Sequence, residues 1–318
     1  MKIHSSVIPQ RGAVLSAHAG LWWGLLGVIA FSFTLPFTRV AVGGLSPLFI
    51  GAGRAVIAAI LAAIALAVTR QRPPTRAQWM RLAVVAGGVV AGFPLLTSFA
   101  MTTAPASHGA VVVGVLPAAT AAMVVLRTRE RPAASFWVFA VLGAVAAIVF
   151  AALQSGGLGD LHWSDLMLFA AVLAAAIGYA EGGLLARELG SWQTVSWALV
   201  LSSPLVAALT AFAAVDRPPS ATTAQWLAFA YLAAVSMFLG FFAWYRGLAL
   251  GPMAQVSQVQ LAQPVLSILW AALLLHEPIG WLTALGGLAV IACAALAVRT
   301  RLNATSLRPT ATFPSEEH

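Results

Sequence analysis

Charged residues are scarce in this chain of 318 residues. Aspartate and glutamate together number 9, the 17 basic residues are almost all arginine, and only 8% of residues are charged. A soluble domain is about 25% charged, so the chain lacks the polar surface that would keep it in water. Since 61% of its residues are hydrophobic, the composition predicts an all-α protein whose solvent is a lipid bilayer.

Cysteine pairs and catalytic signatures are missing as well. The single cysteine, Cys293, excludes an intrachain disulfide framework and a cysteine zinc site. The sequence has no H-E-x-x-H motif, no paired intramembrane aspartates and no nucleotide-binding glycine loop. These absences predict that the protein is not an enzyme and that it binds no metal or cofactor. The net charge of +8 indicates basic loops beside a membrane rather than nucleic-acid binding.

Apolar runs long enough to cross a membrane are abundant. A transmembrane helix needs about 20 apolar residues, and ten such runs are found, at about 20–42, 47–68, 80–101, 106–126, 134–153, 164–186, 193–214, 224–245, 253–274 and 280–298. If the N-terminus is inside, 14 of the 17 basic residues fall on cytoplasmic segments. The sequence therefore predicts a multi-pass protein of a bacterial cytoplasmic (inner) membrane, with cytoplasmic tails at 1–19 and 299–318.

Two segments of the chain repeat one pattern. "GVLPAATAAMVVLRTRERP" (114–132) and "LAQPVLSILWAALLLHEP" (261–278) place Pro117 and Pro264, and also Glu130 and Glu277, 147 positions apart. The offset indicates a duplication into five-helix halves, 20–153 and 164–298. Because five is odd, the halves enter the membrane in opposite senses. Such inverted repeats are a common plan of secondary transporters, with the substrate held near the midplane.

These motifs resemble the EamA-type ten-helix members of the drug/metabolite transporter superfamily. The resemblance covers residues 20–298 and rests on the duplicated pattern and on "SPLFIGAGRAVIAAI", in which Pro47 and Arg54 match a proline and an arginine of the family. Phe31 and Ser32 depart from the family pattern, which often has a Trp-Gly pair there. The resemblance implies an inverted-repeat transporter, often an exporter of amino acids or other small metabolites, and names no single cargo.

Polar residues at membrane depth are the candidates for substrate binding. Gln260, Gln263 and Ser267 share one face of the ninth run, and buried amides are costly unless paired. They line a cavity or form interhelical hydrogen bonds; both interpretations fit. The 147-residue offset pairs this face with a mostly apolar face of the fourth run, in which Thr120 is the one hydroxyl. The same offset places Ser98, Trp244 and Tyr245 near the axis between the halves, and they are the remaining candidates.

Two ions lie within predicted spans. Arg54 is about seven residues inside the second run. Four interpretations fit this position: the side chain attracts a substrate carboxylate, pairs with a fixed acid, snorkels to the headgroups or binds backbone carbonyls. Glu181 is the acid that the spacing places clearly inside a span. It is the candidate for proton coupling, although its position near the helix end, with Arg187 close by, equally fits a partly exposed structural pair.

Four residues are candidates for gating. Pro117 and Pro264 would loosen the fourth and ninth spans so that each bends. Glu130 and Glu277 follow the C-terminal ends of those spans, where the helix dipole disfavours an acid. They either cap the start of the next helix or latch a gate. His108 is interpreted as a polar residue that faces the bundle and not as a metal ligand, because no histidine or acid lies three or four residues away.

The function predicted from these features is secondary transport. A small amphipathic metabolite, such as an amino acid, would be moved by alternating access, with export the expected direction. The driving force is either a proton gradient or the gradient of the substrate. The alternatives are a lipid flippase and a non-transporting membrane receptor or assembly protein. The expected partners are the substrate, the bilayer and protons, and the protein is a monomer or a homodimer.

Overall fold

The computed structural model describes residues 11–129, 133–155, 162–250 and 259–306, and every element in these ranges is helical. The all-α prediction is confirmed. In chain order the elements are α1 (Arg11–Ser32), α2 (Thr34–Ala41), α3 (Pro47–Val68), α4 (Arg76–Val85), η1 (Ala86–Gly92), α5 (Phe93–Ala100), α6 (Ala106–Val113), α7 (Leu116–Thr128), α8 (Ala134–Ser155), α9 (Trp163–Leu189), α10 (Ser191–Asp216), α11 (Thr223–Ala230), η2 (Tyr231–Leu239), α12 (Gly240–Leu250), η3 (Val259–Leu261), α14 (Ala262–Leu275) and α15 (Trp281–Ser306).

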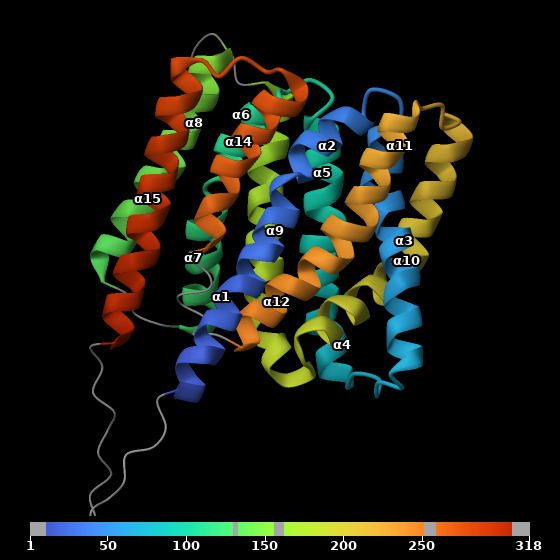
Figure 1. Cartoon of the computed structure of the whole chain (residues 1–318), viewed down its shortest axis with the longest axis horizontal. Helices are drawn as coiled ribbons and strands as arrows, with labels where there is room; N and C mark the ends of the chain where they lie inside the picture. Colours follow the sequence, from blue (N-terminus) through green and yellow to red (C-terminus); the bar gives the residue numbers. More distant parts are fainter. Residues whose placement is uncertain (1–10, 130–132, 156–161, 251–258, 307–318) are drawn as a thin grey trace, which may run out of the picture.

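Joined end to end, these elements form membrane-length helices that pack side by side in one bundle (Figure 1). Within the described residues, eight stretches of 21 to 27 residues are long and apolar enough to cross a membrane. Two shorter apolar helices, Val259–Leu275 and Trp281–Ala297, fall on the last two predicted spans. The helical stretches therefore coincide with the ten runs predicted from the sequence.

The two halves repeat the same local structure at the 147-residue offset. Thr75 and Thr222 each cap a helix through a capping box with a glutamine three residues on, and both have φ −69° and ψ 163°. Arg129 and His276 each end a helix in the left-handed conformation, with φ 56° and 54°. The third and eighth spans each contain a π-helical segment, η1 and η2. These features support the duplication inferred from the prolines.

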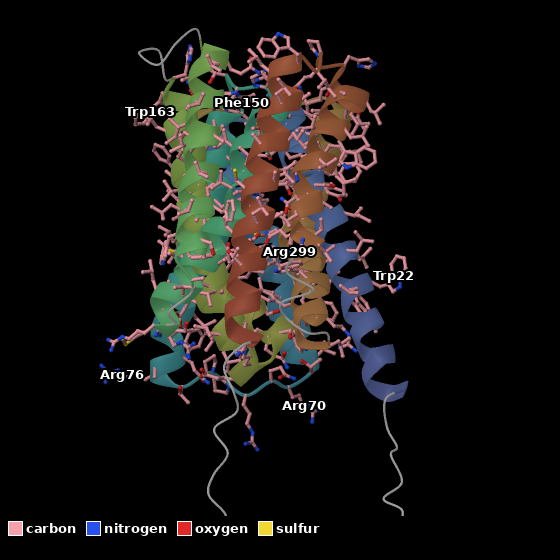
Figure 2. All side chains as sticks on the ribbon, turned by 90° about the vertical axis from the view of Figure 1, so that its left-hand side faces the viewer. Trp22, Arg70, Arg76, Phe150, Trp163 and Arg299 are labelled. Atoms are coloured by element: carbon pink, nitrogen blue, oxygen red, sulfur yellow. The ribbon has the colours of Figure 1, made fainter. Side chains whose placement is uncertain are left out.

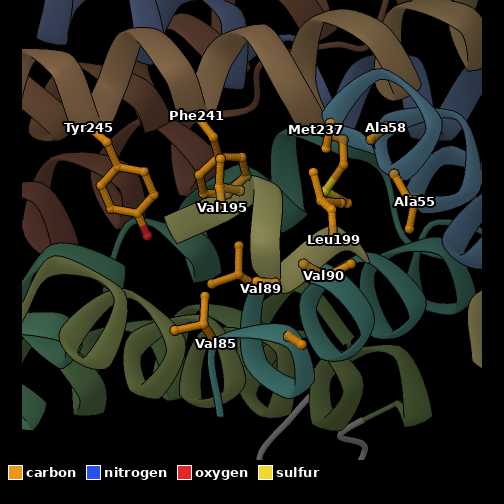
Figure 3. Close-up of a cluster of buried hydrophobic side chains, with 14 of the residues drawn as sticks. Ala55, Ala58, Val85, Val89, Val90, Val195, Leu199, Met237, Phe241 and Tyr245 are labelled. Carbon is orange, nitrogen blue, oxygen red and sulfur yellow. The ribbon is translucent and has the colours of Figure 1, made fainter. Parts of the chain in front are cut away.

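Small side chains let the central helices approach closely. The largest core cluster joins α3 alanines such as Ala55 to apolar residues of η1, α10 and η2 (Figure 3). A Cβ on Gly88 of η1 would lie only 2.9 Å from the backbone nitrogen of Gly178 on α9, so glycine is required where these two helices cross. Close backbone approach of this kind is typical of helix packing in membranes.

Arginines gather at one end of the bundle. Figure 2 shows Arg70 and Arg76 at this end, and Phe150 and Trp163 at the opposite end. We call the first the arginine end and the second the opposite end. Figure 1 shows that α1 begins and α15 ends at the arginine end, as a chain with ten spans requires. Large apolar side chains such as Phe212 (64% exposed) cover the outside, where lipid would meet them.

Candidate functional site

The first span is interrupted at the centre of the molecule. The helix α1 ends at Ser32 and α2 begins at Thr34, and the freed groups are satisfied by α14. The Ser267 hydroxyl donates to the Ser32 carbonyl at 2.7 Å, and the Trp270 indole donates to the Ser32 hydroxyl at 2.9 Å. Phe33 stacks on Trp270 with centroids 4.5 Å apart. The sequence left two interpretations of Ser267, an interhelical hydrogen bond and a place in a cavity wall. The hydroxyl makes the interhelical bond, and the residue also lines a cavity.

Arg54 of α3 is the least expected buried group. Its residue is only 1% exposed, and Nε and Nη2 find no hydrogen-bond partner among the described residues. No described carboxylate forms an ion pair with it. Among the described residues the guanidinium therefore has neither a paired acid nor contact with the surface. A buried charge without a counter-ion is costly.

A narrow cavity of about 20 Å³ opens beside this guanidinium. Its walls come from both π segments, from the break in the first span and from α9, and they consist of Phe31, Thr34, Arg54, Val89, Phe93, Pro94, Ala175, Tyr179, Ser236, Met237, Phe241 and Gln263. The hydroxyls of Thr34 and Ser236 bond across it at 2.8 Å. Aromatic rings cover the apolar side, with Phe31 and Phe241 in edge contact at 4.8 Å. π segments are frequent at functional sites, and here two of them flank one charge.

A second cavity lies beside the start of α7, where the fourth span is interrupted, and beside the start of α14. Pro117 lies in the first turn of α7 and Pro264 lies in the first turn of α14, where proline is tolerated. This cavity, about 10 Å³, is lined by Leu35, Ala110, Val113, Leu116, Pro117, Gln260, Gln263, Pro264 and Ser267. Gln263 lines both cavities, so they adjoin.

Two unpaired amides lie in the walls of these cavities, Gln260 in the second cavity and Gln263 in both. Gln260 Nε2 and Gln263 Oε1 are buried without a partner in the described part of the chain. One is a donor and the other an acceptor, and both need a polar occupant. Thr120 Oγ1 on α7 is likewise buried and unpaired, although it is not among the residues that line either cavity.

Besides Thr120, three predicted site residues lie outside the walls of these two cavities. The Ser98 hydroxyl donates to the carbonyl of Pro94 on its own helix at 2.7 Å. Trp244 and Tyr245 of α12 are 4% and 2% exposed and belong to the apolar core, where Figure 3 shows Tyr245 among the other core side chains. The offset from the first half places them near the axis but does not bring them to these cavities.

Ion pairs hold the bundle together at the arginine end. Glu181 of α9, 6% exposed, binds Arg81 of α4 through Nε and binds Arg127 of α7 at 2.8 Å. Arg81 also reaches Glu188 at 2.5 Å. The structural pairing considered for Glu181 is thus present, with Arg81 and Arg127 as partners and with the carboxylate largely buried. Because Tyr179 lines the Arg54 cavity and Glu181 follows it by two residues, these pairs lie between that cavity and the arginine end.

Hydrogen bonds tie the two halves together at the opposite end. The Glu277 carboxylate accepts from the backbone nitrogens of Ala106 and Ser107 at 2.8 and 2.9 Å, and from the Ser107 hydroxyl at 2.6 Å. It therefore caps α6, in the first half, and not the helix that follows it as the sequence suggested. An acid at a helix N-terminus also complements the dipole. Glu130 lies outside the described residues.

A buried histidine–aspartate pair had no signal in the sequence spacing. His108 of α6 meets Asp165 of α9 with Nε2 2.6 Å from Oδ1. The two residues are 57 positions apart and belong to different halves. Asp165 lies in the first turn of its helix, where an acid in the sequence indicates only the start of a span. Arg81 and Arg127 were noticed only as basic loop residues. In each case the partner comes from another helix, which local spacing cannot show.

Comparisons with known proteins agree with this architecture. The model of the EamA-like transporter family matches residues 18–152 and 162–299. A relative from Bacillus subtilis (strain 168), described as the uncharacterized transporter YdeK, is 44% identical over 276 residues, which cover 87% of this chain and 96% of the relative. A solved crystal structure shares the fold with a TM-score of 0.61 at 20% identity, over 92% of this chain and all of the other. The chain belongs to the EamA-like transporter family.

Proposed function

We propose that this membrane transporter carries a small amphipathic metabolite with a carboxylate, such as an apolar amino acid, and exports it. The observation that carries the proposal is Arg54, fully buried and with two nitrogens unpaired beside a cavity. A carboxylate would supply the missing counter-ion and accept its hydrogen bonds. No protein group among the described residues does so, and hence the cargo is the natural candidate.

The rest of the cavity suits the other parts of such a molecule. Gln263 Oε1 is an unpaired acceptor at the junction of the two cavities and would receive an N–H of the cargo. Phe31, Phe93 and Phe241 offer apolar surface next to it. Each cavity now has room for about one water, so the helices must separate before a metabolite enters.

The contacts at the two ends support a transport cycle of alternating access. Glu181 with its arginines would form the gate at the arginine end, and Glu277 capping α6 would form the gate at the opposite end. The halves 20–153 and 164–298 would rock about the shared cavities, with the interruption before Pro117 and the 3₁₀ turn before Pro264 as flexible points. Proton binding to Glu181 would remove the acceptor of two ion pairs, which makes it a coupling site for an inward proton gradient.

The arginine end would face the cytoplasm, as the positive-inside rule requires. Single cysteines in a Cys293→Ala background test this orientation: Ala77→Cys is exposed at the start of α4, and Ser220→Cys is exposed in the loop before α11. In intact cells a membrane-impermeant maleimide should label the second position and spare the first until the cells are lysed. The reverse pattern would invert the proposed topology.

Counterflow in proteoliposomes tests the function itself. Purified protein would be reconstituted in vesicles loaded with one unlabelled compound, and uptake of the same labelled compound would be followed for amino acids, their decarboxylated amines, their amides and neutral aromatics. We expect counterflow for apolar amino acids and little for amines and amides, because only the acids neutralise Arg54. Equal counterflow of acid and amide, or none for any acid, would contradict the proposal.

A further inference from the structure

The second cavity contains polar groups that the proposed function does not use. Gln260 lines this cavity and is 4% exposed, and its Nε2 has no partner among the described residues. The Ser267 hydroxyl in the same wall already donates to the carbonyl of Ser32. The amide of Gln260 is therefore a free side-chain donor. A buried donor without an acceptor is costly, so an occupant of the cavity is expected to supply the acceptor.

Helix geometry places this donor next to Gln263. Gln260 lies in η3, a single 3₁₀ turn, and Gln263 follows it by three residues at the start of α14. Side chains three residues apart lie on one face of a 3₁₀ helix, which has three residues per turn. Gln263 lines both cavities, and Gln260 lines the second. The two amides thus continue from the Arg54 cavity into the second cavity.

Two prolines free backbone carbonyls in the walls of the same cavity. Proline has no N–H and cannot donate to the carbonyl four residues earlier. For Pro117 this carbonyl belongs to Val113, and for Pro264 it belongs to Gln260. All four residues line the second cavity, which lies where α6 and α14 pack side by side (Figure 1). Within a membrane such carbonyls need another donor, and an occupant of the cavity can provide it.

The other walls of the second cavity disfavour charge. They are apolar and include Leu35, Ala110 and Leu116, and no charged side chain is found among the described residues that line this cavity. An ionised group would lose its hydration here without gaining a counter-ion. A neutral group that both accepts and donates hydrogen bonds fits the free amide and the freed carbonyls. Hydroxyl and carboxamide groups have this property.

We propose that the second cavity is a subsite for the far end of the cargo and selects a neutral hydroxyl or carboxamide there. This inference rests on the proposed function and narrows its cargo. The carboxylate binds Arg54, the amino group donates to Gln263, and the side chain of the cargo accepts from Gln260 and donates to a freed carbonyl. Polar uncharged amino acids therefore satisfy more of the binding groups than apolar amino acids of the same shape.

Amino acids of equal shape test the subsite. Asparagine keeps the α-carboxylate for Arg54 and has nearly the shape of leucine, with a carboxamide in place of two methyl groups. In counterflow by wild-type protein, radiolabelled asparagine should half-saturate exchange at a concentration at least about 5-fold lower than leucine, because leucine leaves the buried donor unpaired. Threonine should exceed valine for the same reason. Aspartate, which has the shape of asparagine but a second charge, should exchange poorly.

Gln260→Met connects this preference to the residue. Methionine has about the length of glutamine but no N–H donor, so the preference for asparagine over leucine should disappear. Gln263→Met is the matched control. Gln263 is proposed to bind the amino group, which both amino acids share, so its loss should weaken both alike and preserve their ratio. Because the readout is a ratio of two cargoes on one preparation, a lower yield of folded protein does not alter it.

Each outcome decides a different claim. Equal exchange of leucine and asparagine by wild-type protein, or a preference for leucine, would overturn the subsite and leave the proposed function intact. Exchange of no amino acid at all would contradict that function itself. A preference for asparagine that persists in Gln260→Met, or aspartate exchange as rapid as that of asparagine, would also overturn the subsite. If Gln260→Met exchanges neither compound, the two wild-type ratios, asparagine to leucine and threonine to valine, decide.

Discussion

Arg54→Gln is expected to abolish transport of a carboxylate cargo while the bundle stays folded. Loss of a desolvated charge that pairs with the cargo costs about 2–5 kcal/mol, roughly a 30-fold or greater fall in affinity. The folded protein gains from the change, because the side chain is 1% exposed and two of its nitrogens are unpaired, so an uncompensated charge is removed. The unfolding temperature of the purified variant should be unchanged or higher.

A conservative variant separates charge from geometry. Arg54→Lys keeps the positive charge but loses the planar fork that binds a carboxylate through two parallel bonds, so transport should be reduced and not abolished. Counterflow and thermal unfolding would be measured on the same preparations. If Arg54→Gln transports normally, or if it unfolds at a markedly lower temperature than wild type, then Arg54 supports the fold and not the cargo.

Glu181→Gln is expected to open the arginine end of the molecule. The change removes the negative charge from both ion pairs of Glu181, with Arg81 and Arg127, and leaves one oxygen to accept from two charged donors. That costs the closed arrangement about 1–3 kcal/mol, or roughly 5- to 150-fold in its population. A cysteine at Ala175, which lines the Arg54 cavity, should then react faster with a thiol reagent applied at this end, and net transport should fall.

Glu188 provides the matched control for this experiment. It bonds the same Arg81 at 2.5 Å, but its side chain is 48% exposed, and exposed pairs contribute about 0–1 kcal/mol. Glu188→Gln should therefore leave the labelling of Ala175→Cys and the transport rate close to wild type, both tested in a Cys293→Ala background. Equal effects of the two substitutions would show that Glu181 is not the gate.

The sequence predicts the fold well because the bilayer imposes it. Apolar runs of membrane length must become helices, since the backbone finds no water to bond there, and the ten helical stretches fall where the runs do. The repeat is visible through Pro117 and Pro264 because proline constrains the backbone wherever it stands. In the structure, the capping boxes at Thr75 and Thr222 lie at the same offset, and the two π segments lie in corresponding spans.

The site is predicted less completely because its contacts join distant helices. Arg54, Gln260 and Gln263 stand out in the sequence, since polar groups are rare at membrane depth, and the structure places them beside the cavities. The pairs of Glu181 with Arg81 and of His108 with Asp165 span 100 and 57 residues, so no local pattern announces them. Tyr245 shows the limit of the repeat offset, which gives a position near the axis but not the neighbours, and here these are apolar core residues.

Counterflow of one radiolabelled apolar amino acid against its neutral amide is the most direct test of the central claim. Wild-type protein in sealed proteoliposomes would be loaded with the unlabelled compound, and the labelled compound would be added outside at the same pH and salt concentration. We expect rapid counterflow of the acid and almost none of the amide, because only a carboxylate would neutralise the unpaired Arg54. Equal counterflow of the two compounds, or counterflow of the amide alone, would contradict it.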